Sequence, residues 1–224
     1  MKVTQVEPQK KNPRRFNVFL DGKFAIGADE DLIVNFRLLP GKEINLEDLE
    51  KLLYEAEVGK LMERMYGLFS IRQRSEKEIR DYLKRLSFKR KIKDESEISE
   101  VVINQLIERA KQKTLINDIE FARSWVDGRR RSKNLGERAL KMELAQKGIA
   151  REIVEEVFSS QSSDIRQEQE EKLATEALEK RINRWKNLPE LEFKKKATDY
   201  LLRKGFEYSF VKNVVEKSIK KGYN

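Results

Sequence analysis

The sequence contains no cysteine and no histidine. Disulfides, zinc sites built from these side chains, thiol nucleophiles and histidine general bases are therefore all excluded. It also lacks a Gly-rich phosphate loop, a GxSxG turn and a Walker-type lysine motif. The residues therefore predict a protein that is not an enzyme and that uses neither a cofactor nor a metal.

Long apolar runs are missing as well. No run approaches the roughly 20 residues that a helix needs to cross a bilayer, and the start, Met1 to Thr4, is not followed by the apolar stretch of a secretion signal. We therefore expect a cytoplasmic protein with no membrane partner.

Charge is what the sequence has in abundance. Of its 224 residues, 39% are charged, and 48 Lys and Arg against 39 Asp and Glu leave a formal net charge of +9. Such an excess suits a phosphate-rich or acidic partner, because each phosphate contact releases condensed counterions. Many soluble proteins are equally basic without binding nucleic acid, so that alternative stays open.

Residues 1–50 have the pattern of a small β module. Asp21-Gly22 stands between two runs rich in aromatic and aliphatic residues, and this dipeptide favours a type I′ hairpin turn. The turn places Phe19 opposite Phe24, and residues 2–6 could add a third strand at an edge. The sequence therefore predicts an N-terminal β-hairpin module.

From Asn45 onward the apolar residues recur with helical spacing. The pattern predicts a long first helix to about residue 71, with a break near residues 57–59. Two helix stops follow a Schellman pattern, because Gly148 and Gly205 each precede an apolar residue. Ser87 holds the equivalent place in a weaker third copy.

Each stop is preceded by a candidate helix start, in which a capping side chain is followed three residues later by glutamate. The caps are Ser75, Asn134 and Asn187. Amphipathic segments lie before each start and after each stop, so the unit is three helices and it occurs three times. A unit of about 50 residues has a marginal core, so neighbouring units should stack or lie in an extended row.

The predicted fold is mostly α, with three tandem three-helix repeats in an elongated row, preceded by the hairpin module. The repeats are expected over residues 51–114, which include the long first helix, and over 115–161 and 165–224. The hinge between the last two is expected at residues 161–164.

The second repeat also resembles a known family. Leu115-Ile116-Asn117-Asp118, Phe121-Ala122, Trp125-Val126, Arg129, Gly136 and the closing Leu144-x-x-Lys147-Gly148-Ile149 resemble the central repeat of RecX, the bacterial regulator of the RecA recombinase. Arg74-Ser75-x-x-Glu78-x-x-x-Tyr82-Leu83 resembles its first repeat. The resemblance covers about residues 55–224, and the hairpin module resembles an extension found in some members.

The resemblance implies a modular, elongated monomer that lies along the groove of a RecA filament on DNA. It implies that the protein restrains ATP hydrolysis and strand exchange by RecA. The expected partners are then the RecA filament and single- or double-stranded DNA.

Candidate contact residues are basic residues at helix ends and linkers. The first candidates are the cluster Arg129, Arg130, Arg131 and Lys133, and the second are Lys141 and Lys147. Lys147 and Lys204 have an alternative interpretation, because a lysine in the last helical turn interacts favourably with the helix dipole.

Other functions are kept as alternatives. A general DNA- or RNA-binding helical repeat protein, not directed at RecA, would share the charge pattern. A base-reading helix should present Arg, Asn or Gln compactly at its start, and an RNA binder should expose stacking aromatics; neither pattern is evident. Paired carboxylates could serve an enzyme, but Asp118 is better explained as a helix cap.

Overall fold

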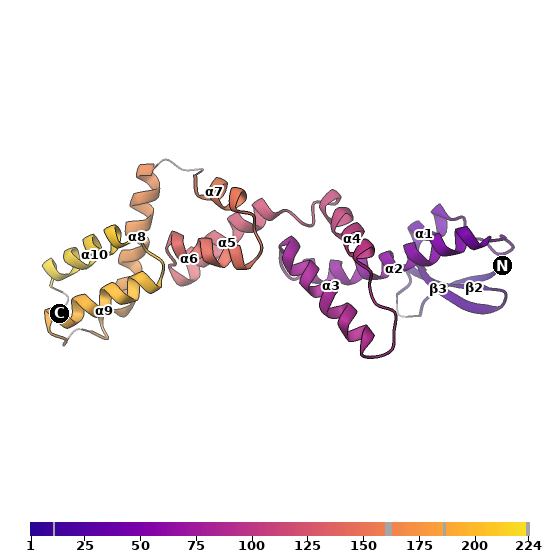
Figure 1. The fold of residues 1–224 in the computed structure, drawn as a ribbon, viewed down its shortest axis with the longest axis horizontal. Helices are drawn as coiled ribbons and strands as arrows, with labels where there is room; N and C mark the ends of the chain where they lie inside the picture. Colours follow the sequence, from indigo (N-terminus) through magenta and orange to yellow (C-terminus); the bar gives the residue numbers. More distant parts are fainter. Residues whose placement is uncertain (11, 160–162, 186, 223–224) are drawn as a thin grey trace. The chain divides into compact units, whose positions relative to one another are not determined.

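The computed structural model describes residues 1–10, 12–159, 163–185 and 187–222, and these residues form a mostly helical chain (Figure 1). The described residues contain ten helices and three strands. The chain divides into two compact units: the first comprises residues 1–73 and 82–115, and the second comprises residues 74–81 and 116–224.

The N-terminal module is an antiparallel sheet in the order β1-β2-β3, with strands β1 (Val3–Pro8), β2 (Arg15–Leu20) and β3 (Lys23–Asp29). Asp21 and Gly22 have φ angles of 48° and 81°, as a type I′ turn requires. Phe19 pairs with Phe24, and their rings meet edge to face at 6.0 Å. The predicted hairpin and its edge strand β1 are confirmed.

Helix α1 (Glu30–Asn35) follows the sheet, and α2 (Leu46–Phe69) packs against β3. The Asn45 side chain caps α2 by accepting from the Asp48 N–H at 2.7 Å. The predicted break near residues 57–59 is wrong, because α2 is continuous there. Gly59 instead permits a close approach: a Cβ at Gly59 would lie 3.0 Å from Oδ2 of Asp29.

Helices α3 (Glu76–Lys91) and α4 (Glu100–Gln112) come next, and α3 contributes its first residues to the second unit and the remainder to the first. The predicted stop at Ser87 is wrong, since α3 runs through it. Ser87 is buried, and its hydroxyl accepts from the Ile98 N–H at 2.9 Å. A long-range hydrogen bond therefore explains this serine.

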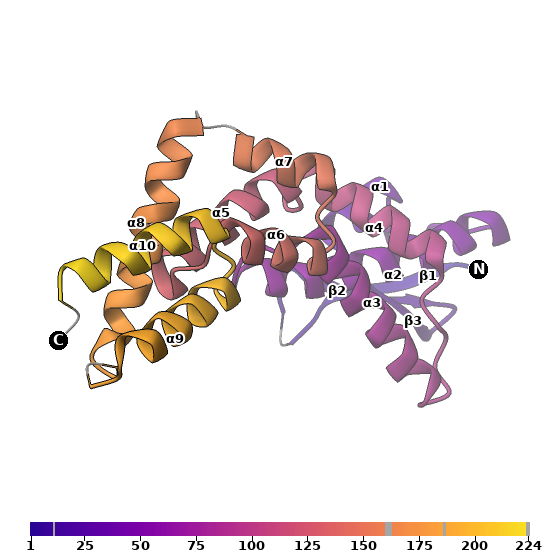
Figure 2. The ribbon, with the colours of Figure 1, turned by 60° about the vertical axis from the view of Figure 1, so that its left-hand side comes forward.

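The second unit holds two complete three-helix repeats, each around its own apolar core (Figure 2). In the repeat of α8, α9 and α10, each helix packs against the other two. The six helices are α5 (Asp118–Lys133), α6 (Glu137–Gln146), α7 (Arg151–Ser159), α8 (Ser163–Ile182), α9 (Glu190–Arg203) and α10 (Tyr208–Lys220).

Both glycine stops are confirmed. Gly148 and Gly205 have φ angles of 78° and 87°. The Ile149 N–H donates to the Leu144 carbonyl at 3.1 Å, and Phe206 donates to Leu201 at 3.3 Å, as the Schellman motif requires.

Only one of the three predicted starts is confirmed. The Ser75 hydroxyl accepts from the Glu78 N–H at 3.2 Å at the start of α3. Asn134 instead ends α5 in the left-handed conformation, and Gly136 is the cap residue of α6. Pro189, rather than Asn187, precedes α9.

The three-helix pattern is nevertheless found three times, as α2–α4, α5–α7 and α8–α10. The numbered domain boundaries and the elongated row stay predictions. Of the predicted hinge, residues 161 and 162 lie outside the described residues.

Candidate partner-binding surface

The basic cluster predicted from the sequence occupies the last turns of α5. Arg129 is half-buried, and its Nε lies 2.8 Å from Oε2 of Glu143 on α6. The same carboxylate oxygen accepts from the Trp125 indole N–H at 2.7 Å, and the guanidinium of Arg129 lies 4.4 Å from the centre of the Trp125 ring. Arg129 therefore holds α5 to α6.

Arg130 pairs with a buried glutamate of the next repeat. Its Nη2 lies 3.2 Å from Oε1 of Glu170 on α8, and the two side chains are 17% and 4% exposed. Glu170 also accepts from the Glu137 N–H at 3.0 Å, at the start of α6. Burial raises the pKa of Glu170, while the Glu137 N–H and Arg130 act in the opposite direction. This pair joins α5, α6 and α8.

Lys141 and Lys147 are engaged as well. Lys141 lies 3.0 Å from Glu137 and 2.8 Å from Glu155. Lys147 stands at the end of α6, but its Nζ lies 2.6 Å from Glu78 and 4.8 Å from the centre of the Trp125 ring. The side chain of Lys147 thus contacts the start of α3 as well as its own repeat.

Arg131 and Lys133 are different, because both are exposed. The Arg131 Nε donates to the Asp127 carbonyl of its own helix at 3.3 Å. Within the part of the chain that the structure describes, neither side chain forms an ion pair with a carboxylate. Of the six candidates, these two offer a partner their full charge.

The structure also contains a repeated helix junction that the sequence did not reveal. At the first copy, the Ser75 hydroxyl donates to the Lys147 carbonyl at 2.8 Å, and Asp118 accepts from the Glu76 N–H at 3.0 Å. Asp118 therefore does cap a helix, but that helix is α3 rather than its own.

At the second copy, the Gly136 and Arg138 N–H groups donate to the carbonyls of Lys204 and Gly205 at 3.0 and 3.1 Å. Here the Glu170 carboxylate accepts from the Glu137 N–H, as the Asp118 carboxylate accepts from the Glu76 N–H at the first copy. In both copies, the end of the middle helix of one repeat contacts the start of the middle helix of the preceding repeat. Backbone carbonyls at that helix end accept hydrogen bonds from groups at the helix start. The two glycine stops were the only sequence signal for this arrangement.

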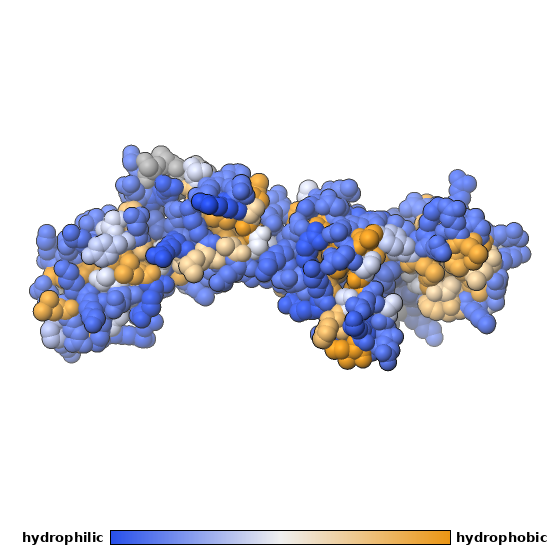
Figure 3. Space-filling view, in the orientation of Figure 1, coloured by the Kyte–Doolittle hydropathy of each residue, from blue (hydrophilic) through white to orange (hydrophobic). Residues whose placement is uncertain are grey.

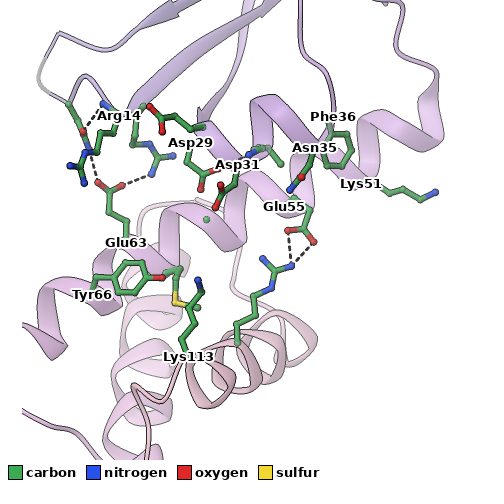
Figure 4. A pocket seen from close by; sticks show the side chains of 17 residues that line it. Arg14, Asp29, Asp31, Asn35, Phe36, Lys51, Glu55, Glu63, Tyr66 and Lys113 are labelled. Carbon is green, nitrogen blue, oxygen red and sulfur yellow. Dashed lines mark hydrogen bonds and ion pairs between the residues drawn. The ribbon is translucent and has the colours of Figure 1, made fainter.

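The first unit contains a cavity of about 880 Å³ between the sheet module and the helices α2 and α4 (Figure 4). On one side Glu63 accepts from Asn12 and pairs with Arg15, and on the other Glu55 pairs with Arg109 at 2.8 Å. Two of the cavity's arginines are thus neutralised. Among the described residues, no group of three or more acidic side chains could hold a metal ion.

The visible face of the protein is predominantly hydrophilic (Figure 3). Lighter and orange patches interrupt it over α6 and over the α9–α10 hairpin, among other places. No helix in the described ranges combines the length and the apolar character that a membrane span requires.

Comparisons with known proteins agree along most of the chain. Three family models match: the N-terminal domain of regulatory protein RecX over residues 1–45, its second three-helix domain over residues 117–157, and its third over residues 168–215. The regulatory protein RecX of Bacillus subtilis (strain 168) is 35% identical over 209 residues, which are 93% of this chain and 74% of that protein. That of Listeria innocua is 31% identical over 212 residues, covering 95% and 74%.

Solved structures give the same result. A crystal structure of regulatory protein RecX superposes with a TM-score of 0.75 at 25% identity, over 96% of this chain and 98% of that one. RecX from Lactobacillus salivarius has a similar fold, with a TM-score of 0.59 over 71% of this chain and 95% of its own, at 24% identity.

Proposed function

The chain belongs to the RecX family of regulatory proteins, and we propose that it binds the RecA–DNA filament and mainly inhibits its ATP hydrolysis and strand exchange. It acts as a monomeric binding protein and not as an enzyme. The observation that carries the proposal is the likeness to RecX proteins over nearly the whole chain. The net charge of +9 supports it, because both DNA and acidic protein surfaces attract a basic protein.

The proposed contacts follow from the ion pairs. Arg131 and Lys133 meet the filament directly, because both are exposed and neither has a carboxylate partner among the described residues. Arg129, Arg130, Lys141 and Lys147 hold α5, α6 and their neighbours in place, because each would have to give up an ion pair to reach a partner. They act by positioning the last turn of α5.

The test is the single-strand-dependent ATP hydrolysis of RecA, measured while the protein is titrated in. Its binding to bare DNA is measured in the same buffer. Suppression of hydrolysis at concentrations well below those that saturate the DNA supports a filament-directed regulator. Tight, salt-sensitive DNA binding without suppression would favour the general nucleic-acid-binding function instead.

The contact residues are tested with an Arg131→Ala/Lys133→Ala variant. We expect it to fold normally and to suppress hydrolysis less well. A Lys60→Ala/Arg64→Ala variant is the matched control, since it also removes two positive charges from exposed positions, on α2 in the first unit. An equal loss in both variants would point to net charge rather than to the end of α5.

A further inference from the structure

A groove of about 760 Å³ opens in the second unit beside the junction of α6 with α9 and α10. Three large apolar side chains on it are exposed to solvent: Met142 is 59% exposed, Leu202 38% and Tyr208 62%. The buried ring of Phe206 also lines the groove. Its volume falls in the range of ligand pockets and suffices for a few side chains of a partner.

The other copy of this junction shows that folding does not need these apolar residues. Counted from the cap residues Ser75 and Gly136, the position of Met142 corresponds to Asp81. Counted from the two glycine stops, Leu202 corresponds to Ala145 and Tyr208 to Arg151.

The same close contact between a glycine stop and a helix start is thus built with Asp81, Ala145 and Arg151 in those places. The exposed parts of Met142, Leu202 and Tyr208 contribute no buried apolar surface to the fold. Clustered apolar residues of this kind mark an interaction site.

The charges around the groove indicate what covers it. Arg138 is exposed and, among the described residues, forms no ion pair. The cap residue of α10, Glu207, makes no side-chain hydrogen bond to the helix, and the first turn of α10 lines the groove with Tyr208 and Phe210, so the positive end of the helix dipole lies beside it. Both features favour a carboxylate on the partner.

A nucleic acid fits this groove less well. Two of its cations, Lys141 and Arg166, are already paired with Glu137, and the carboxylates of Glu137 and Glu207 also line it. The successive phosphates of a strand would meet these acids, and of the three exposed apolar side chains only Tyr208 offers a flat surface on which a base stacks.

We propose that this groove binds a short segment of a protein partner, with one large apolar side chain between Met142, Leu202 and Tyr208 and a single carboxylate at Arg138. The proposal rests on the proposed function, on which the segment belongs to a RecA subunit of the filament. The apolar side chain supplies most of the buried surface, and Arg138 fixes the direction of the segment.

The test exchanges the groove residues for their counterparts at the first junction, in the variant Met142→Asp/Leu202→Ala/Tyr208→Arg of the full chain. Binding is measured to RecA filaments on single-stranded DNA with a non-hydrolysable ATP analogue. We expect the affinity to fall about tenfold or more, as for the central residues of an interface. Leu191→Asp is the control, because Leu191 is 84% exposed on α9 and does not line the groove.

A second measurement uses the absence of cysteine in the chain. A Met142→Cys variant carries an environment-sensitive fluorophore, and filament binding should shift its emission to shorter wavelength, while a fluorophore on Leu191→Cys should not respond. Circular dichroism establishes that each variant is folded.

The outcomes separate the two proposals. If the unmodified chain does not bind the filament, the proposed function fails, and this inference fails with it. If the chain binds and the triple variant binds equally well, only the groove is wrong. If the triple variant instead loses binding to bare single-stranded DNA to the same degree, the occupant is nucleic acid and the protein segment is overturned.

Discussion

Gly136 and Gly205 lie backbone against backbone, at the start of α6 and the end of α9. A Cβ at Gly136 would fall 2.6 Å from the carbonyl carbon and oxygen of Gly205, closer than real Cβ contacts allow. The two positions therefore require glycine for different reasons. Gly205 adopts a positive φ that ends its helix, and Gly136 leaves the space into which that helix end fits.

Replacing Gly136 by alanine should therefore destabilise the second unit. We expect Gly136→Ala to lower the free energy of unfolding by about 1 to 3 kcal/mol, because the new methyl group overpacks a contact made by backbone. Urea denaturation followed by circular dichroism measures the change. Gly128→Ala is the control, since Gly128 lies inside α5 and a Cβ there meets no described atom outside the backbone of that helix within 4 Å, and alanine should stabilise the helix by about 1 kcal/mol. Equal effects of the two changes would contradict the close contact.

Ser75 should contribute more than an ordinary helix cap. Its buried hydroxyl accepts from the Glu78 N–H and donates to the Lys147 carbonyl. We expect Ser75→Ala to cost about 2 kcal/mol, the sum of a lost cap and a lost buried hydrogen bond. Ser99→Ala removes only a cap, on α4, and should cost about 1 kcal/mol. A Ser75 effect no larger than that of Ser99 would mean that the bond to Lys147 contributes nothing.

Glu170 should give the stability a characteristic pH dependence. Burial raises its pKa above the ordinary 4.5, so the folded state binds the proton more tightly than the unfolded chain does. Its contribution to stability is fully present below pH 4.5 and is lost as the pH rises through the folded-state pKa. Glu170→Gln should therefore remove a decline in unfolding free energy that begins near pH 4.5.

The matched variant for this pH series is Glu155→Gln. Lys141 lowers the pKa of Glu155 by a hydrogen bond and by its charge, so the contribution of Glu155 is present above its unfolded pKa and is lost as the pH falls. Urea denaturation over a pH range that extends both below and above 4.5 should give difference curves of opposite slope for the two variants, below pH 4.5 for Glu155→Gln and above it for Glu170→Gln. Slopes of the same sign would contradict the assignment for Glu170.

Salt should reveal how many phosphates the end of α5 neutralises. If Arg131 and Lys133 each contact a phosphate of single-stranded DNA, their double alanine variant should reduce the slope of log K against log salt by about 1.4. The slope is measured by fluorescence anisotropy with a labelled oligonucleotide over a series of salt concentrations. An unchanged slope would place both side chains away from the DNA, and any loss of filament binding would then arise from contact with protein.

Several of the features predicted correctly from the sequence are those that neighbouring residues determine. The Asp21-Gly22 turn needs only positive φ angles at two adjacent positions, and the stop at Gly148 is closed by bonds to Leu144 and Ala145 of the same helix. Such structures depend on a few consecutive residues, and the residue types at those positions are therefore sufficient to identify them.

Two of the errors concern polar residues whose partners lie on another segment of the chain. Ser87 lies inside α3, and its hydroxyl accepts from the Ile98 N–H on another segment instead of ending the helix. Asn134 has the side chain of a helix cap, but its side-chain Nδ2 donates to Glu176 and its side-chain Oδ1 accepts from Lys180, both on α8. Local patterns cannot distinguish these uses from capping, since the same groups form either hydrogen bond.

The candidate surface illustrates the same limit. The sequence correctly marks a basic cluster, but Arg130 and its partner Glu170 are 40 residues apart, and no periodicity connects them. Which of four neighbouring cations stays available to a partner depends on where α6 and α8 pack. That information exists only in the folded second unit.

The junctions also determine the order in which the helices can be completed while the chain is being synthesised. The Ser75 hydroxyl cannot donate to its acceptor, the Lys147 carbonyl, until a further 72 residues have been synthesised. The N–H groups at the start of α6 likewise stay open until Lys204 and Gly205 have emerged. The middle helices of the first two repeats, α3 and α6, are thus completed by a later part of the nascent chain, so a ribosome that pauses between two repeats leaves an unfinished helix start exposed to water.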